Sequence, residues 1–245
     1  MKEKERLDKI LVDRGLVKSR ERAKALIMEG RVTVCGQKAA KPGTMVASAA
    51  DIALREDDIP YVGRGGLKLE AALDFFAIDP AGKVVMDIGC STGGFTDCLL
   101  KRNAAKVYAV DVGYGQFDWS LRHDPRVVLM EKTNIRYLGR EAVPGVIDLA
   151  VIDVSFISLL KVLPKAMDFL GEDGEVLALI KPQFEVGKGM VGKGGVVRDE
   201  AQRTAVVEKV REGAEETGLR TIGVFESPIQ GQKGNREYFI YLGRK

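Results

Sequence analysis

The sequence predicts an α/β protein in which a doubly wound, mostly parallel seven-stranded sheet follows a small α+β domain. Apolar strands alternate with helical segments beyond residue 60, and the first of these strands breaks into a glycine-rich turn. This alternation favours a sheet covered by helices on both faces. Acidic or basic residues follow several of the strands, at the edge where such sheets bind ligands.

Length and charge divide the chain into two parts. Its 245 residues, 45% of them hydrophobic, suit one small and one large domain, and we expect these to be residues 1–59 and 60–245. The net charge is only +3, yet residues 1–41 hold 12 Lys and Arg against 6 Asp and Glu. This basic segment predicts contact with a polyanion.

The composition argues against several classes of protein. No apolar run approaches the roughly 20 residues that span a bilayer, and the charged N-terminus has no apolar segment after it. Cys35, Cys90 and Cys98 form no C-x-x-C pair and His123 is the single histidine, so neither a disulfide framework nor a metal site is expected. We therefore expect a cytoplasmic protein with no membrane and no metal partner.

The first domain is expected to hold two helices followed by short strands. Gly15 and Gly30 are typical helix terminators, and Ser19 is a good N-cap for the second helix. The expected elements are, in order, a helix over 6–14, a helix from Ser19 to Gly30, a strand over 31–34, and one or two strands within 44–54.

This segment closely resembles the alpha-L RNA-binding module of a ribosomal small-subunit protein, of pseudouridine synthases and of tyrosyl-tRNA synthetase. The match runs through RLDKILVDRGLVKSRERAKALIMEGRVTVCGQ. In that family the two helices and the next loop present basic side chains to structured RNA. The resemblance implies RNA-binding roles for Lys9, Arg14, Lys18, Arg20, Arg22, Lys24 and Arg31. An ordinary solvated helix pair is the alternative.

A polar stretch, residues 55–60, is expected to link the two domains. The sequence YVGRGG then leads into a helix over 67–76, with Leu69 and Leu73 on one face and Lys68 in its first turn. A lysine at the positive end of a helix dipole is mildly unfavourable, so its placement suggests a specific role.

The glycine-rich turn lies within residues 84–100, VVMDIGCSTGGFTDCLL, where it follows a buried strand and opens a helix. Its glycines let the backbone turn sharply and approach a ligand, and Ser91, Thr92 or the glycines can cap the helix. The first N–H groups of that helix then face whatever lies over the turn.

Two acids indicate the kind of ligand. Asp87 lies in the strand end, where a carboxylate repels a pyrophosphate, and the spacing D-x-G-x-x-x-G differs from the dinucleotide pattern. Asp111 ends the next apolar strand, where doubly wound folds bind ribose hydroxyls. Together these features resemble the S-adenosylmethionine site of a class I, Rossmann-like methyltransferase.

The remainder of the domain continues the alternation of strands and helices. Asn134 lies just beyond the third strand, where its amide could meet an adenine edge, and Trp119 lies in a loop or short helix. The further expected elements are strands over 106–112, 127–130, 147–152, 175–180, 220–225 and 238–242, and helices over 159–170 and 199–217.

Two further motifs are weaker. Residues 187–194 nearly match a phosphate loop, but Gly194 replaces the final hydroxyl and no helix follows directly, so nucleotide hydrolysis is rejected. Residues 153–156, DVSF, faintly resemble the [DN]-P-P-[YF] loop of base amino-group methyltransferases but lack both prolines, and Phe156 could simply pack.

Four charged residues are expected at one rim of the sheet: Lys68, Asp153, Lys181 and Glu237. Two ammonium and two carboxylate groups in one cleft shift each other's proton affinities. A ribose hydroxyl is a poor nucleophile, and a partly desolvated lysine beside a second lysine can act as its base. This K-D-K-E arrangement resembles that of the FtsJ-type RNA 2'-O-methyltransferases.

With YVGRGGLKL, DIGCSTGGF, DVSF, KPQFE and the RNA module, the whole chain resembles the TlyA family, hemolysin-labelled bacterial proteins that methylate the 2'-hydroxyl of cytidine in ribosomal RNA. The resemblance implies that Lys181 is the base, that Lys68 and Asp153 orient or tune it, and that Glu237 completes the set. It implies S-adenosylmethionine as cofactor and ribosomal RNA or ribosomal subunits as partner. The implied cofactor contacts are Asp87, Gly89, Cys90, Gly93, Asp111, Val112 and Asn134.

Two other functions stay open from the sequence, which does not indicate the modified nucleotide or the oligomeric state. A membrane-active hemolysin is disfavoured because no long apolar or strongly amphipathic segment is present. An RNA-binding assembly factor without catalysis is disfavoured because all four charged residues of the expected rim are in place.

Overall fold

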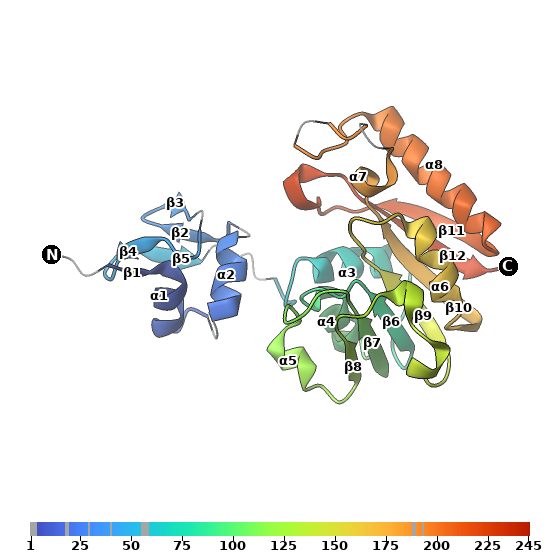
Figure 1. Cartoon of the computed structure of the whole chain (residues 1–245), viewed down its shortest axis with the longest axis horizontal. Coiled ribbons are helices and arrows are strands. Elements are labelled where there is room, and N and C mark those ends of the chain that lie inside the picture. Colours follow the sequence, from blue (N-terminus) through green and yellow to red (C-terminus); the bar gives the residue numbers. More distant parts are fainter. Residues whose placement is uncertain are drawn as a thin grey trace. The chain divides into compact units, whose positions relative to one another are not determined.

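The computed structural model describes residues 4–17, 20–28, 30–39, 41–54, 59–187, 190–192 and 194–245. The chain divides into two compact units, Met1–Ile59 and Pro60–Lys245, both drawn in Figure 1. Each unit has a hydrophobic core of its own.

The N-terminal unit packs α1 and α2 against small antiparallel sheets. Its described elements are β1 (Lys4–Arg6), α1 (Leu7–Asp13), α2 (Arg20–Met28), β2 (Val32–Val34), β3 (Gln37–Lys38), β4 (Met45–Ala47) and β5 (Ile52–Leu54). β1 pairs with β4, and the other strands form a sheet in the order β3-β2-β5. Leu7, Leu11 and Ile27 are almost completely buried in its core.

Glycines in the left-handed region follow both helices of this unit. Gly15 has φ +67° and Gly30 has φ +70°, conformations that a residue with a Cβ adopts only with strain. The expected N-cap, Ser19, lies outside the described residues. The strands predicted within 31–34 and 44–54 are present as β2, β4 and β5.

The C-terminal unit is built on a seven-stranded sheet with the strand order β11-β12-β10-β9-β6-β7-β8. The strands are β6 (Val84–Ile88), β7 (Lys106–Val110), β8 (Val127–Met130), β9 (Ile147–Ile152), β10 (Leu170–Ile180), β11 (Leu219–Glu226) and β12 (Tyr238–Arg244). The strands from β6 to β10 pair in parallel, whereas β12 runs antiparallel to both of its neighbours. The predicted mostly parallel sheet is therefore confirmed.

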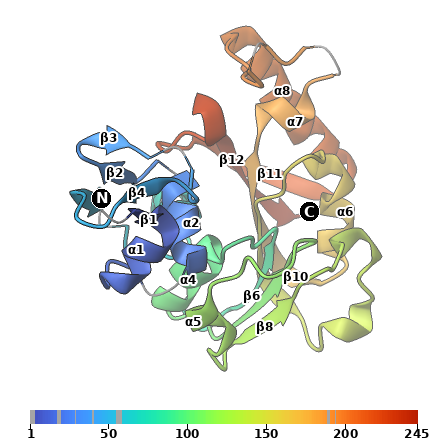
Figure 2. The ribbon, with the colours of Figure 1, turned by 60° about the vertical axis from the view of Figure 1, so that its left-hand side comes forward.

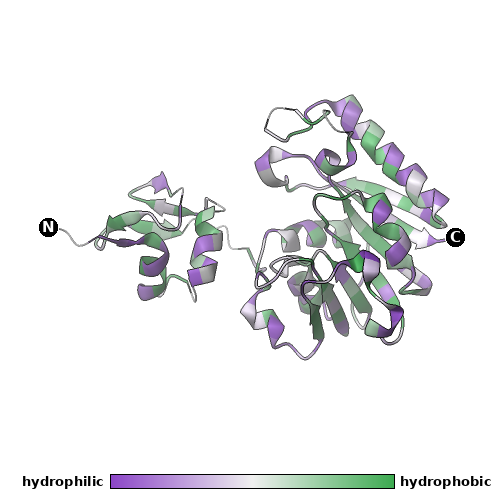
Figure 3. Cartoon of the chain, in the orientation of Figure 1, coloured by the Kyte–Doolittle hydropathy of each residue, from purple (hydrophilic) through white to green (hydrophobic). Residues whose placement is uncertain are grey.

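Helices cover both faces of this sheet, with α6 and α8 on one side and α4 on the other (Figure 2). The helices are α3 (Gly65–Phe75), α4 (Gly94–Lys101), α5 (Trp119–Arg122), α6 (Leu163–Met167), α7 (Pro182–Glu185) and α8 (Glu200–Glu216). Figure 3 shows hydrophobic residues concentrated in the strands and hydrophilic residues along the outer side of α8. This distribution is the one expected of an amphipathic helix on a buried sheet.

Side chains that alternate along the strands fill two separate cores. On one face, Met86 and Ile152 belong to the same buried cluster as Leu163 of α6 and Val206 of α8. On the other face, the ring of Phe239 stacks on Phe95 of α4, with 6.2 Å between the ring centroids. The parallel strands are thus largely buried on both faces, and in such sheets ligands bind at the edge formed by the carboxyl ends of the strands.

One predicted helix is wrong in its extent. The segment expected to be helical over 159–170 instead forms a short 3₁₀ turn, Leu159–Lys161, followed by the brief α6, and Leu170 already belongs to β10. Pro164 lies in the first turn of α6. Because proline lacks an N–H donor and clashes with the preceding turn, it fits a helix start but not a helix interior, and the helix must begin anew there.

The helix predicted over 67–76 begins two residues earlier, at Gly65, and its first turn packs very closely on its surroundings. A Cβ on Gly66 would overlap the ring of Tyr61, and one on Gly94, at the start of α4, would lie 3.0 Å from the Gly66 nitrogen. The glycines of the two turns therefore allow the starts of α3 and α4 to touch.

Candidate active site

A cleft of about 530 Å³ opens at the carboxyl ends of the parallel strands. Its apolar wall includes Ile88, Val110, Val112 and Ile135, and its polar groups come from the segments that follow β6, β7, β8 and β9. The polar side chains lining it are Ser91, Asp111, Gln116, Thr133, Asn134, Asp153 and Ser155. An apolar pocket with a few polar groups is typical of a small-molecule site.

The floor of the cleft is the glycine turn between β6 and α4. Gly89 has φ +88°, and a Cβ there would lie 2.5 Å from the carbonyl oxygen of Asp153. A side chain at this position would therefore push the turn away from the end of β9. Gly93, with φ +94°, precedes α4 as its N-cap residue, and no side chain caps the helix. The glycines thus serve as the cap, one of the options that the sequence left open.

Asp111 presents a fixed carboxylate to the cleft. Its Oδ2 accepts a hydrogen bond from the Ser91 N–H at 2.8 Å, and its Oδ1 accepts one from the Gly113 N–H at 2.6 Å. Each carboxylate oxygen can accept a further bond, so the group remains able to bind a pair of hydroxyls. The two backbone donors hold it in one orientation, which is what recognition of a ribose requires.

Asn134 reaches the cleft from the segment that follows β8. Its Oδ1 accepts a hydrogen bond from the Arg136 N–H at 3.1 Å, which makes it the N-cap of the 3₁₀ turn Ile135–Tyr137. The carbonyl side of the amide is thereby held, and the Nδ2 donor is left to face the cleft. Gln116 and Thr133, which no sequence motif indicated, line the same wall.

The implied cofactor contacts divide into two groups. Gly89, Asp111, Val112 and Asn134 line the cleft, whereas Asp87, Cys90 and Gly93 do not. Asp87 is completely buried, and its Oδ2 accepts a hydrogen bond from the Thr96 hydroxyl at 2.6 Å. This carboxylate joins β6 to α4 beneath the turn, and its part in cofactor binding stays a prediction.

Burial also changes the protonation of these hidden groups. Loss of solvent raises the pKa of Asp87 to about 7, although the Thr96 hydrogen bond opposes this shift and the neighbouring Asp153 adds to it. Burial likewise raises the pKa of the Cys90 thiol well above its usual range. Cys90 is therefore an inert packing residue of the turn.

Lys181 and Asp153 form an ion pair beside the cleft. The Lys181 Nζ lies 2.6 Å from Asp153 Oδ1, and the two side chains are only 12% and 22% exposed. Lys181 does not form its hydrogen bond with Asp153. Its Nζ donates to Ser155 Oγ at 3.0 Å, and Asp153 Oδ1 accepts no hydrogen bond from the described residues. Asp153 thus acts on the lysine mainly through charge.

Lys68 and Glu237 form a second, more deeply buried pair. The Lys68 Nζ donates to Glu237 Oε2 at 2.5 Å, and the side chains are 11% and 2% exposed. Because Ile180 pairs with Tyr238 across β10 and β12, the next residue, Lys181, lies at the same end of the sheet as Glu237. A Cβ on Gly231 would overlap the Glu237 carboxylate, so this glycine leaves room for the pair.

Two of the basic residues implied in RNA binding are engaged within the N-terminal unit. Arg20 donates to Asp8 at 3.1 Å, and Arg14 donates to the carbonyl oxygens of Ser48 and Ala50. The carboxylate of Asp8 is completely buried, and the Arg6 guanidinium, helped by Arg20, holds its pKa well below the usual range. Arg20 is thus a structural residue whatever else it binds.

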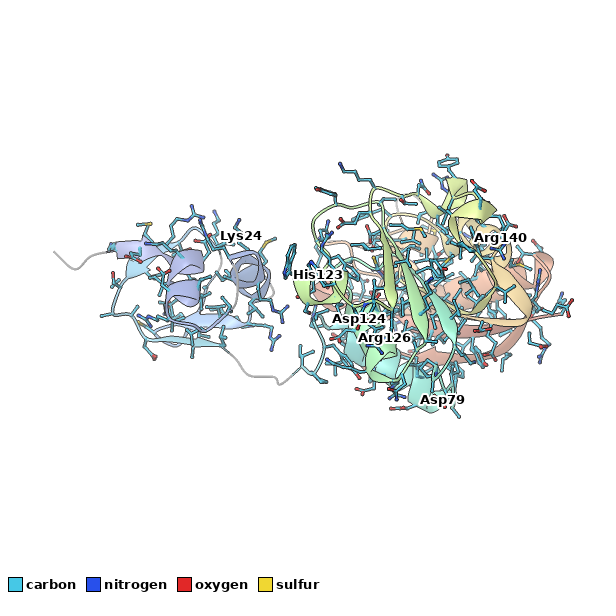
Figure 4. All side chains as sticks on the ribbon, turned by 90° about the horizontal axis from the view of Figure 1, so that it is seen from below. Lys24, Asp79, His123, Asp124, Arg126 and Arg140 are labelled. Atoms are coloured by element: carbon cyan, nitrogen blue, oxygen red, sulfur yellow. The ribbon has the colours of Figure 1, made fainter. Side chains whose placement is uncertain are left out.

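The other residues implied in RNA binding differ in their exposure and in their interaction partners. Lys9 lies 3.6 Å from Glu5 and 3.8 Å from Asp13, distances of weak exposed pairs. Arg22 and Arg31 have interaction partners, and Lys18 lies outside the described residues. Lys24 is exposed on α2 and labelled in Figure 4. Lys9 and Lys24 are therefore the basic side chains whose replacement disturbs the unit least.

The side chain of Phe156 is mostly exposed, although the sequence left open that it simply packs. It is 90% exposed, has φ +64°, and lines the cleft with one contact to the ring of Phe184 at 4.8 Å between centroids. A left-handed conformation is costly for a bulky residue. The DVSF pattern marked this segment, but nothing in the sequence indicated the exposure of its aromatic ring.

The structure offers neither a metal centre nor a membrane span in the part of the chain that it describes. These ranges contain no group of three or more His, Cys, Asp or Glu side chains able to hold a metal ion. Within the same residues, the helices are too short or too polar for any of them to cross a membrane.

Comparison with known proteins supplies the family. The model of the FtsJ-like methyltransferase family matches residues 61–244, and that of the S4 domain matches residues 5–52. Over 243 residues the chain is 49% identical to "16S/23S rRNA (cytidine-2'-O)-methyltransferase TlyA" of Mycobacterium tuberculosis, covering 99% of this chain and 91% of that protein. The chain belongs to the TlyA family.

Other relatives explain the hemolysin label. The chain is 40% identical to "Hemolysin A" of Brachyspira hyodysenteriae, covering 97% of this chain and 99% of that protein. Among solved structures it is similar to "Putative hemolysin from Streptococcus thermophilus", with a TM-score of 0.78, 42% identity and coverage of 100% of this chain and 90% of that one. The TlyA family therefore includes proteins with either name and one fold.

Proposed function

We propose that this chain transfers the methyl group of S-adenosylmethionine to the 2'-hydroxyl of a cytidine in ribosomal RNA. The observation that carries the proposal is the ion pair of Lys181 and Asp153, which stands at the rim of a cleft suited to a small molecule. A hydroxyl acceptor needs a base beside the methyl donor, and this rim supplies a candidate. The printed function of the Mycobacterium tuberculosis relative supports the acceptor.

The cleft fits the proposed cofactor. The fixed carboxylate of Asp111 would accept from its ribose hydroxyls, and Asn134 would meet its adenine edge over the apolar wall of Ile88, Val110 and Ile135. The two carboxylates that line the cleft, Asp111 and Asp153, suit a ligand with a positive centre. When bound, S-adenosylmethionine supplies a methyl group on a sulfonium that leaves as a neutral thioether.

Lys181 would take the proton of the acceptor. The proton of the ribose hydroxyl would pass to the Lys181 amine, which would become an ammonium, as the 2'-oxygen received the methyl group and the neutral thioether left. Asp153 then stabilises that ammonium by charge at 2.6 Å. Lys68 and Glu237 neutralise each other nearby, so the rim gains no net charge from them.

The N-terminal S4 unit would dock the ribosomal RNA. Its basic surplus and exposed Lys24 favour phosphate contacts, which give affinity without reading sequence. The choice of cytidine would then come from the second unit, where the target nucleotide meets the cleft. A ribosomal substrate implies that the protein works in the cytoplasm.

The test is methyl transfer to purified ribosomal subunits from cells that lack the protein. We expect labelled methyl groups to appear on ribosomal RNA, at cytidine 2'-oxygens when the modified positions are mapped, with one demethylated cofactor released per methyl group. Subunits incubated with the Lys181→Ala variant serve as the matched control. An assembly factor without catalysis would bind the subunits and leave them unlabelled, and that result would contradict the proposal.

A further inference from the structure

Lys181 forms a hydrogen bond with Ser155, which is not one of the four charged residues of the rim. Its Nζ donates to Ser155 Oγ at 3.0 Å, whereas Asp153 Oδ1, although only 2.6 Å away, is not aligned to accept. Charge attraction depends on distance and hardly on angle, while a hydrogen bond is directional. Ser155 therefore determines where the hydrogens of the lysine point.

That direction matters for a base. A neutral amine has two N–H bonds and one lone pair in a tetrahedral arrangement, and only the lone pair can take a proton. A lysine side chain rotates freely about its last bond unless a partner holds it. If one N–H of the amine is held by Ser155 and the other is drawn toward Asp153, the direction of the lone pair is fixed as well.

The segment that carries Ser155 is held at both ends. The Asp153 N–H donates to the carbonyl oxygen of Ile88 at 2.9 Å, and the Leu159 N–H donates to the buried Glu185 Oε1 at 2.7 Å. Between them, the left-handed turn at Phe156 rests on Phe184. Since Glu185 and Phe184 belong to α7, which starts directly after Lys181, the same contacts fix the serine and the lysine relative to each other.

Ser155 also lines the cleft, so the group that it orients faces the place where an acceptor would meet the cofactor. The charged groups around Lys181 are Asp153 at the end of β9 and Glu237 at the start of β12, the latter paired with Lys68 of α3. None of these offers a neutral, directional acceptor. The hydroxyl of Ser155 is the neutral acceptor that holds one N–H of Lys181 in a defined direction.

We propose that Ser155 is a positioning residue that aims the lone pair of Lys181 at the ribose 2'-hydroxyl. The inference rests on the proposed function and adds a residue to its machinery. The chemical step is unchanged, since the proton still moves from the 2'-oxygen to the Lys181 nitrogen. What Ser155 changes is the fraction of encounters in which the amine is correctly oriented.

The experiment compares Ser155→Ala, Ser155→Cys and Ser155→Thr in single-turnover methyl transfer on ribosomal subunits at saturating S-adenosylmethionine. We expect the rate constant to fall by about 10- to 100-fold in Ser155→Ala, the usual cost of a misplaced catalytic group. Ser155→Cys should fall similarly because a thiol is a weak acceptor, and Ser155→Thr should retain most of the rate because it keeps the hydroxyl. Cofactor and subunit affinities should stay unchanged.

The pH profile separates orientation from a simple change in protonation. If Ser155 orients the amine, the rate of Ser155→Ala should be lower than that of the wild type at every pH of a series from about pH 6 to 9, because a misdirected lysine is a poor base at any pH. A deficit that disappears at high pH would contradict the proposal. Ser158→Ala is the matched control, since Ser158 lies on the same segment and only caps the turn at Leu160.

Two failures can be told apart. A wild-type chain that transfers no methyl group to any subunit contradicts the proposed function, and this inference falls with it. An active wild type whose Ser155→Ala variant keeps its full rate contradicts the role of Ser155 alone. A Ser155→Thr variant as slow as Ser155→Ala, with both folded and binding cofactor normally, would contradict it as well.

Discussion

Carboxylates with little exposure are paired with cations in both units, but the type of cation differs. In the N-terminal unit, Asp8 is clamped by the guanidinium groups of Arg6 and Arg20. At the rim of the second unit, Glu237 and Asp153 are paired with Lys68 and Lys181. Arginine stays charged and binds carboxylates in a fixed fork, whereas lysine is a rotatable donor that can lose its proton. The first arrangement stabilises a fold, and the second can take part in chemistry.

The sharpest test of this difference exchanges the two kinds of cation at the rim. In Lys181→Arg the guanidinium keeps the positive charge but cannot act as a base, so methyl transfer should fall by about 10²- to 10⁴-fold, as it should in Lys181→Ala. Single-turnover methyl transfer on ribosomal subunits is the readout. Calorimetric titration should show unchanged cofactor affinity. Near-normal transfer by Lys181→Arg would show that the position supplies only charge.

The reciprocal test removes the arginine clamp of the N-terminal unit. Arg6→Ala combined with Arg20→Ala leaves the buried Asp8 without a cation, which should destabilise this unit by about 3 to 5 kcal/mol. Hydrogen exchange at the amides of α1 in the full chain measures the effect. Lys9→Ala on the same helix is the control, because its exposed pairs contribute about 1 kcal/mol at most. Unchanged protection in the double variant would contradict a structural role for the clamp.

The same clamp predicts a pH dependence. Because the arginines lower the pKa of Asp8 in the folded state, their stabilisation is fully present above the unfolded pKa of about 4 and is lost as the pH falls through the lower folded value. Protection of α1 should therefore decline below about pH 4 in the wild type and depend less on pH in Asp8→Asn. A variant that declines as steeply as the wild type would assign the acid sensitivity to another group.

A smaller effect is expected where a carboxylate serves a ligand and has no cationic partner. Asp111→Ala should weaken cofactor binding by about 1.5 to 3 kcal/mol, the usual contribution of hydrogen bonds to a charged group. Calorimetric titration is the measurement. Asp118→Ala is a suitable control, since Asp118 caps α5 and does not line the cleft. Equal affinities for the Asp111→Ala variant and the wild type would remove Asp111 from the site.

The smallest change is expected from the exposed lysines of the N-terminal unit. Lys9→Ala and Lys24→Ala should each flatten the dependence of log affinity on log salt by about one unit for every phosphate that the lysine neutralises in the wild type. Binding of ribosomal subunits at several salt concentrations measures the slope, while cofactor affinity should not move. A slope identical to that of the wild type in the double variant would place the RNA elsewhere. Arg20 is unsuitable for this test, because its replacement also disturbs Asp8.

Much of the fold follows from the sequence because its signals are local. The period of the apolar residues located the strands from β6 to β12, and the glycines located the turn after β6. The helix predicted over 159–170 was wrong in its extent, because the prediction followed the spacing of the apolar residues. It did not take into account that Pro164 fits the start of a helix and not its interior. The burial of Asp87 was not predicted, because the motif gives its position along the strand and not the side to which its carboxylate points.

The site was harder to predict from the sequence, because its residues are far apart along the chain. Lys68 and Glu237 are 169 positions apart, and only the sheet order brings them together. The topology rule predicted one rim for all four charged residues, but it could not say that they pair as Lys68 with Glu237 and Lys181 with Asp153. Ser155 and the internal engagement of Arg14 and Arg20 depend on side-chain geometry, which has no sequence signature.

The antiparallel β12 has a consequence for the order in which the molecule is made. The strands that build the cleft, from β6 to β10, leave the ribosome before β12, which must then insert between β10 and β11. Until it does, Lys68 lacks its partner Glu237. Since chains fold progressively from the N-terminus during synthesis, we expect the pairing of Lys68 with Glu237 to be among the last contacts of the second unit to form.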